Sequence, residues 1–203
     1  MPKKKKKKHG LLIVVSGPSG VGKSTVVRKL LKLDKSIKLS VSATTRPPRP
    51  GEINGIHYYF VSQPEFDGMV KKKEFLEWAK VHGFYYGTRQ SVIEQDLAKG
   101  KSLLCEVDVQ GAASIKRLVE KGDLEASAVF IFLIPPSVDI LAFRLKRRKT
   151  EDEEVVNYRL RAAIAELQVM EKYDYIVVND RVESAADKIR AIINVEKERT
   201  LLN

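Results

Sequence analysis

Eight consecutive residues have the types and the spacing of a phosphate-binding loop, and they read Gly-Pro-Ser-Gly-Val-Gly-Lys-Ser from position 17 to position 24. In such a loop the glycines let backbone N–H groups close around phosphate oxygens, the lysine reaches the β- and γ-phosphates, and the serine hydroxyl binds Mg²⁺. A glycine-rich turn that binds no ligand would have no need of the Lys-Ser pair. We therefore predict a nucleoside triphosphate site at Gly17, Pro18, Ser19, Gly20, Val21, Gly22, Lys23, Ser24 and Thr25.

The flanking segments predict that this loop joins a strand to a helix. Leu11–Val15 is an unbroken apolar run, which is typical of a buried parallel strand. Val26–Leu31 carries apolar pairs four residues apart, which indicates an amphipathic helix. The amino end of that helix would attract a phosphate anion. The order strand, loop, helix is the context in which the motif binds nucleotides.

The composition predicts one globular domain. The chain has 203 residues, of which 43% are hydrophobic and 31% are charged, values that exclude a disordered protein. No apolar stretch approaches the roughly 18 residues of a membrane-spanning helix, and we expect no secretory signal. The single cysteine, Cys105, cannot form an internal disulfide. We therefore expect a cytoplasmic protein without a membrane partner.

Six of the eleven net positive charges belong to the run Lys3–Lys8. Consecutive lysines repel one another, so we expect residues 1–9 to form a disordered, solvated basic arm. The alternatives are weak binding to polyanions and a nuclear localisation signal. The remaining five charges fit a protein that holds phosphorylated nucleotides with arginines. They predict no specific nucleic-acid partner.

Buried strands separated by helical segments predict a doubly wound parallel sheet with helices on both faces. Besides Leu11–Val15, the expected core strands are Ser102–Asp108, Ala128–Ile134 and Tyr175–Asn179. A mixed β/α insertion at residues 42–92 interrupts this core. Within and beside this insertion we expect four strands, at Lys38–Ser42, His57–Val61, Phe75–Ala79 and Tyr85–Thr88. We also expect a proline-rich loop at Ala43–Gly51 and two helices, at Pro64–Lys72 and Ser91–Lys99. A capping box at Thr150 and Glu153 predicts a further helix.

Short motifs occur along the chain in a specific order and spacing, at Ser16–Gly20, Ser42–Glu52, Gly55–Tyr58, Phe75–Trp78, Tyr85–Gly87, Asp108–Gly111 and Val178–Asp180. In these motifs the chain, from Leu11 to Asn179, resembles the guanylate kinase family of P-loop nucleoside monophosphate kinases. The resemblance implies an α/β, three-layer P-loop kinase fold with a central parallel sheet, a mixed β/α GMP-binding insertion and a helical lid. It implies a kinase domain at 10–203, with its core at 10–41, 93–136 and 169–203, the GMP-binding region at 42–92 and the lid at about 137–168.

Two arginines in the proline-rich loop are candidates for binding the phosphate of GMP. Arg46 and Arg49 lie three residues apart on a stiff segment, which suits a forked clamp on one phosphate. Tyr58 and Tyr86 can donate hydroxyl hydrogen bonds to the same phosphate, as the matching tyrosines do in the family. The alternative for the arginine pair is an exposed loop without a ligand.

Glu77 is the candidate for recognising the guanine base. Guanine presents N1–H and an exocyclic NH₂ side by side, and one ionised carboxylate can accept from both. Adenine lacks the N1 donor, so Glu77 would disfavour AMP. Ser42 and Thr88 offer hydroxyls for the O6 and N7 acceptors, and the resemblance places Asp108 towards the guanine. The alternative for Glu77 is a surface charge, which its apolar neighbours argue against.

Two acidic residues end the expected strand Ser102–Asp108, where a magnesium-ordering carboxylate belongs in this fold class. Glu106 and Asp108 alternate, so they face opposite sides unless the strand has already ended. By resemblance, Glu106 holds water on Mg²⁺, and Ser24 is the other metal-binding residue.

Four arginines between positions 144 and 159 can bring positive charge to the migrating phosphoryl group. The resemblance assigns Arg144, Arg148 and Arg159 to catalysis together with Lys23 and Arg46, and it places Asn179 against the adenine of ATP. The family usually has Arg-Gly-Thr before the lid helix, whereas this chain has Lys149 in place of the glycine. A lysine has access to fewer backbone conformations than the glycine that the family has at this turn.

The resemblance implies a Mg²⁺-dependent reaction in purine nucleotide metabolism, in which ATP phosphorylates GMP, and dGMP as well, by direct in-line transfer. One alternative is a related kinase of a ribose phosphate, which the guanine-reading set Ser42, Glu77 and Thr88 argues against. Another is a non-catalytic module that binds phosphorylated proteins, which the intact phosphate loop argues against. Nothing in the sequence distinguishes a monomer from a homo-oligomer.

Overall fold

The computed structural model describes residues 10–81, 83–146 and 153–202. Its centre is a five-stranded parallel sheet in the order β2-β7-β1-β8-β9. These strands are β1 (Leu11–Ser16), β2 (Ile37–Leu39), β7 (Ser102–Glu106), β8 (Ser127–Ile134) and β9 (Tyr175–Val178). Every residue of β1 is buried because β1 is the middle strand and both faces of the sheet are covered.

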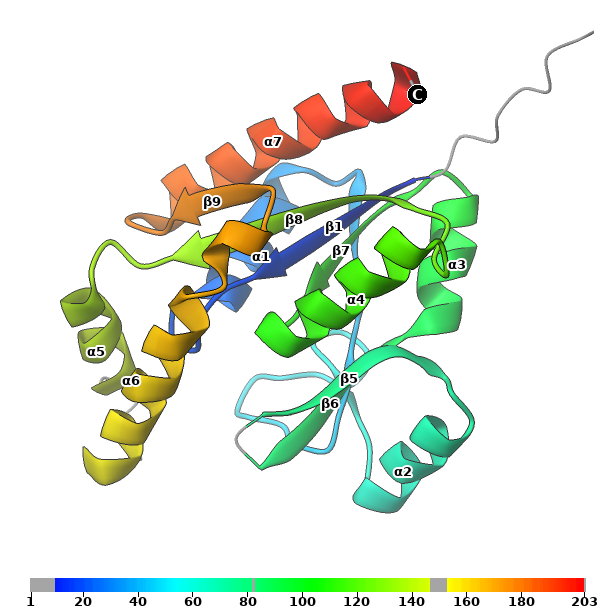
Figure 1. Ribbon diagram of the computed structural model, residues 1–203. Coiled ribbons are helices and arrows are strands. Elements are labelled where there is room, and N and C mark those ends of the chain that lie inside the picture. The colour runs from blue at the N-terminus through cyan, green and yellow to red at the C-terminus, as the bar shows by residue number, and fades with distance from the viewer. Residues whose placement is uncertain (1–9, 82, 147–152, 203) are drawn as a thin grey trace, which may run out of the picture.

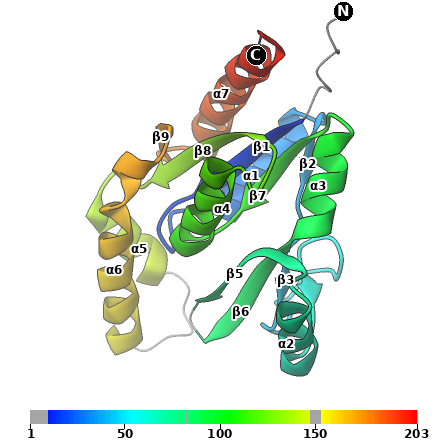
Figure 2. The same cartoon turned by 45° about the vertical axis from the view of Figure 1, so that its right-hand side comes forward.

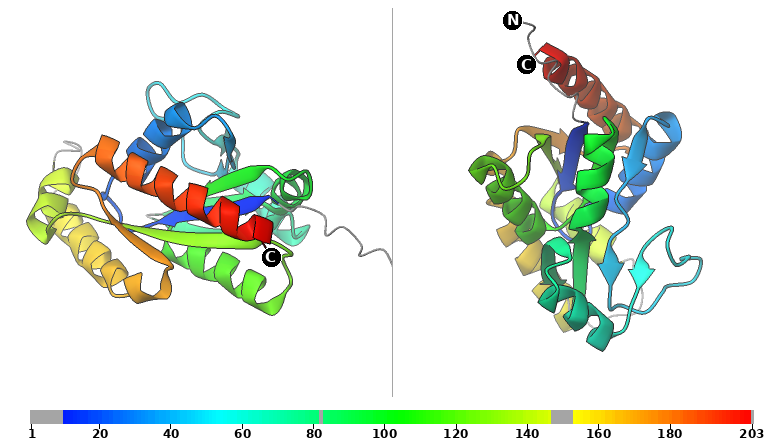
Figure 3. Two further views of the ribbon diagram at one scale, coloured as in Figure 1. Left: turned by 90° about the horizontal axis from the view of Figure 1, so that it is seen from above. Right: turned by 90° about the vertical axis from the view of Figure 1, so that its right-hand side faces the viewer.

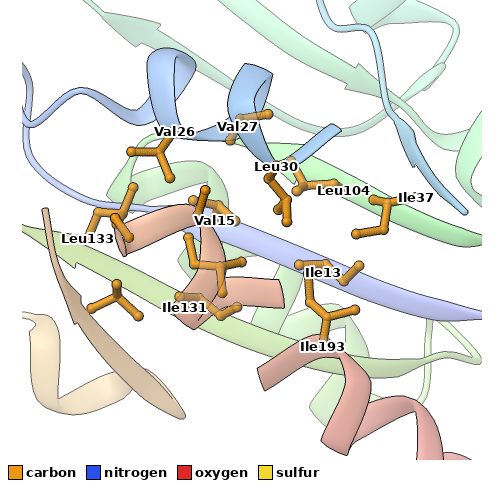
Figure 4. Packing of buried hydrophobic residues seen from close by; sticks show 14 of the residues in the cluster. Ile13, Val15, Val26, Val27, Leu30, Ile37, Leu104, Ile131, Leu133 and Ile193 are labelled. Carbon is orange, nitrogen blue, oxygen red and sulfur yellow. The ribbon is translucent and has the colours of Figure 1, made fainter. Parts of the chain in front are cut away.

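Two pairs of helices cover the two faces of this sheet (Figures 1 and 3). The helices α1 (Lys23–Leu33) and α7 (Val182–Leu202) pack on one face, and α3 (Gln90–Ala98) and α4 (Val109–Lys121) pack on the other. Successive strand residues point to opposite faces, so Ile13 and Val15 meet α1 and α7, whereas Leu12 and Val14 meet α3 and α4. Figure 4 shows the first of these two clusters.

A second, smaller sheet forms the insertion between α1 and α3. Its strand order is β4-β3-β6-β5. The strands are β3 (Ala43–Thr44), β4 (Tyr59–Phe60), β5 (Phe75–Val81) and β6 (Phe84–Arg89), and α2 (Gln63–Lys71) packs against them. The rings of Phe66 in α2 and Phe75 in β5 stack at 4.6 Å between centroids. A capping box between Ser62 and Glu65 begins α2.

Two further helices form the part that we call the lid, α5 (Val138–Lys146) and α6 (Glu153–Leu167). They share a small apolar cluster of Leu141, Leu145, Val156 and Ala163. A short 3₁₀ segment, η1 (Met170–Lys172), leads from α6 to β9. Figures 1 and 2 show the lid and the insertion on two sides of the carboxyl ends of the core strands. The phosphate loop and the end of β7 lie at these carboxyl ends, on adjacent strands.

The predicted fold class is confirmed, but several strands differ in extent from the prediction, and the strand expected at His57–Val61 is limited to Tyr59–Phe60. The strand expected at Lys38–Ser42 ends at Leu39, and the chain then enters the other sheet at β3. Thr44 Oγ1 donates to the carbonyl of Tyr85, and the Tyr85 N–H donates to Thr45 Oγ1. These two bonds secure a segment that proline content alone predicts to be a loop.

The strand expected to reach Asp108 ends at Glu106, because Asp108 is the N-cap of α4. The predicted capping box at Thr150 and the predicted basic arm at residues 1–9 lie outside the described residues. The boundaries of core, insertion and lid stay predictions. None of the described helices has the length and apolar character that crossing a membrane requires.

Candidate active site

The phosphate loop connects β1 to α1, and its backbone has positive φ angles at three glycines, Gly17, Gly20 and Gly22. Gly17 and Gly22 have φ angles of 145° and 99°, which other residues rarely adopt. A β-carbon on Gly17 would lie 2.3 Å from the carbonyl oxygen of Leu133, and one on Gly22 would lie 2.8 Å from Asn179 Nδ2. The loop is therefore fitted closely between the ends of β8 and β9.

Lys23 and Ser24 open α1 and point in two directions. The ammonium of Lys23 donates to the carbonyl oxygens of Gly17 and Pro18, at 2.5 and 3.2 Å, so it curls back over the loop. The Ser24 hydroxyl donates to Glu106 Oε1 at 2.5 Å. Burial raises the pKa of Glu106, while the Ser24 hydroxyl and the charge of Lys23 oppose that rise. Thr25 follows in the first turn of α1, where its N–H donates to the Gly22 carbonyl.

Two of the three predicted lid arginines, Arg144 and Arg159, lie within the described residues, and both contact the phosphate loop. Arg144 donates from Nη1 to the Val21 carbonyl at 3.1 Å and from Nη2 to the Asn179 carbonyl at 3.0 Å. Asn179 itself donates from Nδ2 to the Val21 carbonyl at 2.7 Å. Arg159 is only 7% exposed and donates from Nη2 to Ser19 Oγ at 3.3 Å. The third predicted lid arginine, Arg148, lies outside the described residues, as does Lys149.

In the insertion, Arg46 is buried and held by a carboxylate that sequence reasoning missed. Its Nη2 lies 2.9 Å from Glu52 Oε1, and the Arg49 N–H donates to Glu52 Oε2 at 2.7 Å. Burial opposes ionisation of Glu52, but these bonds outweigh it and lower the pKa of that carboxyl. The signal was the position of Glu52 at the end of the arginine motif.

Two aromatic rings of the insertion, those of Tyr58 and Phe60, lie near the Arg46 guanidinium. Its carbon lies 5.5 Å from the centroid of the Tyr58 ring, and the Tyr58 and Tyr86 rings meet edge to face at 5.9 Å. Cation–π contact of this kind stabilises a guanidinium that has left bulk water. The side chain of Arg49 is exposed. The structure thus brings three of the four predicted phosphate-binding side chains together, Arg46, Tyr58 and Tyr86, and leaves Arg49 exposed.

Glu77 lies in β5, and only 8% of it is exposed. Thr88, its partner on β6, donates from Oγ1 to Glu77 Oε1 at 2.6 Å. Burial and the charge of Asp108 raise the pKa of Glu77 to about 7, although the Thr88 hydroxyl opposes this. Asp108 accepts the N–H of Gly111 at 2.9 Å as the N-cap of α4. Ser42 stands next to β3, where its carbonyl accepts the Tyr59 N–H.

Gly111, in the first turn of α4, is a second residue whose role sequence reasoning missed. A β-carbon at this position would lie 2.5 Å from Glu77 Oε2 and 3.2 Å from Val107 Cβ. The carboxylate of the insertion therefore sits directly against the amino end of a core helix, where the helix field favours negative charge. Only glycine leaves room for that approach. The sequence signal was the glycine that ends the motif Asp108–Gly111.

Comparison with known proteins agrees with this arrangement. The sequence model of the guanylate kinase family matches residues 9–196 of this chain. A guanylate kinase of Desulfitobacterium hafniense is 48% identical over 94% of this chain and 92% of the relative, and one of Caldanaerobacter subterraneus is 48% identical over 95% and 91%. The crystal structure of guanylate kinase from Anaplasma phagocytophilum matches with a TM-score of 0.76 and 36% identity, over 94% of this chain and 88% of that one.

Because Gly111 lies against Glu77 and Gly68 lies against nothing, replacing each of these helical glycines with alanine should have opposite effects on stability. Gly68 in α2 has nothing within 4 Å of the position of its missing β-carbon, so Gly68→Ala should raise the free energy of unfolding by about 0.5–1 kcal/mol. Gly111→Ala should lower it by about 1–3 kcal/mol, because the new methyl group meets a packed carboxylate. Urea denaturation measures both. Equal stability of the two variants would contradict the constraint, and in a Glu77→Ala background most of the cost of Gly111→Ala should disappear.

Proposed function

This chain belongs to the guanylate kinase family and phosphorylates GMP with ATP, and we propose that the transfer is direct and in line, without a covalent enzyme intermediate. In this proposal ATP binds at the phosphate loop and GMP binds in the insertion. One observation carries the proposal. The hydroxyl of Ser24 touches Glu106 at the end of β7, and the residues that follow β7 touch Glu77 of the insertion.

On the ATP side, the loop N–H groups and Lys23 bind the phosphates. Lys23 must leave the Gly17 and Pro18 carbonyls to do so, and a phosphate oxygen is the stronger partner because it is charged. Arg144 and Arg159 place positive charge at the transferred group, where charge spreads over oxygens in the transition state. We assign Arg148 the same role from its position in the sequence. Asn179 borders the loop where the adenine would lie.

The oxygen donors at the end of β7 fit a magnesium ion. Ser24 Oγ and Glu106 Oε1 are both hard oxygen ligands and lie 2.5 Å apart. Within the described part of the chain no group of three or more His, Cys, Asp or Glu side chains could hold a metal ion by itself. Mg²⁺ is commonly bound by one or two protein oxygens together with substrate phosphates and water. When bound, the ion neutralises charge on the phosphates.

On the GMP side, the buried carboxylate of Glu77 accepts from the N1–H and the exocyclic NH₂ of guanine. Ser42, Thr88 and Asp108 complete the contacts to the base. The phosphate of GMP is bound by Arg46, Arg49, Tyr58 and Tyr86. Before GMP binds, Glu52 holds the Arg46 side chain in position. Because these residues read the base and the phosphate, we propose that the site also accepts dGMP. We propose a cytoplasmic location and a role in purine nucleotide metabolism.

A coupled assay of ADP release separates this function from its alternatives. The purified protein is supplied with ATP, Mg²⁺ and either GMP, AMP or a ribose bisphosphate. Rapid turnover with GMP alone is expected. Turnover with the ribose bisphosphate would favour a ribose phosphate kinase, and absence of turnover with all three would favour a non-catalytic binding module. Omission of Mg²⁺ should abolish the GMP reaction.

Lys23→Ala should abolish turnover while GMP binding persists, since the two nucleotides occupy separate sites. A charge-assisted phosphate contact contributes about 1.5–3 kcal/mol to binding and more in the transition state. Steady-state kinetics and calorimetry with GMP measure the two effects. Lys32→Ala, an exposed residue on the same helix, is the matched control and should behave as the wild type. Loss of GMP binding in Lys23→Ala would refute the assignment of two sites.

Glu77→Gln should lower kcat/KM for GMP by roughly 30- to 1000-fold, which corresponds to about 2–4 kcal/mol. The amide keeps the size of the side chain but replaces one acceptor oxygen with an NH₂ donor, which then faces a guanine donor. The weak activity with AMP, which has no N1 donor, should change little or improve. Normal phosphorylation of GMP by the variant would show that Glu77 does not read guanine.

The affinity for GMP should fall as the pH is lowered through about 7. A protonated Glu77 can no longer accept from both guanine donors, and the pKa of this carboxyl in the free protein is raised to about 7. Below that pH the loss approaches about tenfold per unit. Calorimetric titration between pH 5.5 and 8.5 measures it. The phosphate of GMP titrates near pH 6, so Glu77→Gln serves as the reference. Identical pH profiles for the two proteins would contradict the prediction.

A further inference from the structure

Two side chains of the lid helix α6 contact one residue of the phosphate loop. Glu166 Oε2 accepts the backbone N–H of Ser19 at 2.9 Å, and Arg159 Nη2 donates to the hydroxyl of the same serine at 3.3 Å. The two side chains are seven residues apart, which is two helical turns, and so they lie on one face of α6. The residue that follows, Gly20, packs against Leu145 of α5. The segment Ser19–Gly20 is therefore where both lid helices contact the phosphate loop.

Glu166 occupies a position that its own helix disfavours. It lies in the last turn of α6, which contains no basic residue, and a carboxylate near the carboxyl end of a helix is repelled by the helix dipole. Burial and the charge of Asp108 raise the pKa of Glu166, whereas the Ser19 N–H and Lys23 oppose the rise. Local helix stability thus gives no reason for an acidic side chain here. The favourable contact of this carboxylate is the one with the phosphate loop.

Two of the cations of the proposed ATP site contact neighbouring residues of this segment of the loop. Lys23 donates to the carbonyl of Pro18, and Arg159 donates to the hydroxyl of the next residue, Ser19. If the Ser19 backbone were released from Glu166, the hydroxyl that orients Arg159 would move with it. A transferring group is sensitive to such displacements, since a shift of about 1 Å can cost about 100-fold in rate.

We propose that Glu166 is a positioning residue for phosphoryl transfer: its carboxylate fixes Ser19 of the phosphate loop to α6 and thereby places Arg159 beside the group that Lys23 binds. The proposal rests on the proposed function, in which Arg159 acts on the transferred phosphoryl group. What matters in Glu166 is the acceptor oxygen, and an uncharged acceptor of the same shape can replace it.

Three variants of α6 test the proposal through steady-state kinetics with ATP and GMP, GMP calorimetry and thermal melting. Glu166→Ala removes the acceptor and should lower kcat by about 10- to 100-fold, with the dissociation constant of GMP unchanged. Glu166→Gln keeps an oxygen that can accept the Ser19 N–H, so its kcat should return to within about threefold of wild type. Glu154→Ala, at an exposed position of the same helix, is the control and should match the wild type.

A fourth variant keeps the test decisive if Glu166→Ala folds poorly. Ser19→Ala retains the N–H that Glu166 accepts but loses the hydroxyl that orients Arg159, so its kcat should also fall without a loss of melting temperature. The double variant Ser19→Ala/Glu166→Ala should be no slower than the slower single variant, because both act through Arg159. Additive losses in the double variant would overturn the proposed chain of contacts.

Three results in an active wild-type enzyme would overturn the proposal. Normal kcat in Glu166→Ala would show that the contact has no role in transfer. Equal damage in Glu166→Gln and Glu166→Ala would show that the charge is required, not the acceptor. A retained kcat with tighter ATP binding in both would show that the carboxylate competes with phosphate. A wild-type protein inactive with GMP would instead refute the proposed function.

Discussion

The parallel pairing of β1 with β7 is the contact on which both proposed nucleotide sites depend. Its register places Val15 opposite Glu106, so the chain that leaves β1 as the phosphate loop returns in α1 next to the end of β7. Ser24 and Glu106 meet there on the ATP side. Two residues after Glu106 the chain enters α4, whose Gly111 touches Glu77 of the insertion. One pair of strands therefore sets the distance between the two sites.

Three acids at the candidate site are fully or partly buried, and burial raises the pKa of each of them, Glu77, Glu106 and Glu166. Each accepts a hydrogen bond from a neighbouring protein group, respectively the Thr88 hydroxyl, the Ser24 hydroxyl and the Ser19 N–H. One partner compensates only part of the cost of taking a carboxylate out of water. The rest of this desolvation cost would be offset by the donors of guanine at Glu77 and by a hydrated metal ion at Glu106. These ligands would explain why an arginine-rich protein keeps carboxylates at its centre.

The sequence predicted those parts of the molecule that depend on residues close together in the chain. The loop from Gly17 to Ser24 and the core strands follow from residue types at short spacing, whereas the resemblance to guanylate kinases identified Glu77 as the candidate base reader. The partners of these residues did not follow. Glu52 holds Arg46, Gly111 admits Glu77, and Glu166 binds a loop residue 147 positions away. Such contacts depend on how distant elements pack, and the path of the chain from β2 into β3 escaped prediction for the same reason.

The central claim is that ATP and GMP bind at adjacent sites, with their phosphates meeting at the end of β7. Inhibition by an adenosine and a guanosine joined through a polyphosphate chain tests this claim most directly. If the two sites face each other as proposed, one such molecule occupies both, and steady-state kinetics will show competitive inhibition against ATP and also against GMP. Competition with only one of the two nucleotides would contradict the account, because the linked molecule would then be unable to reach both sites at once.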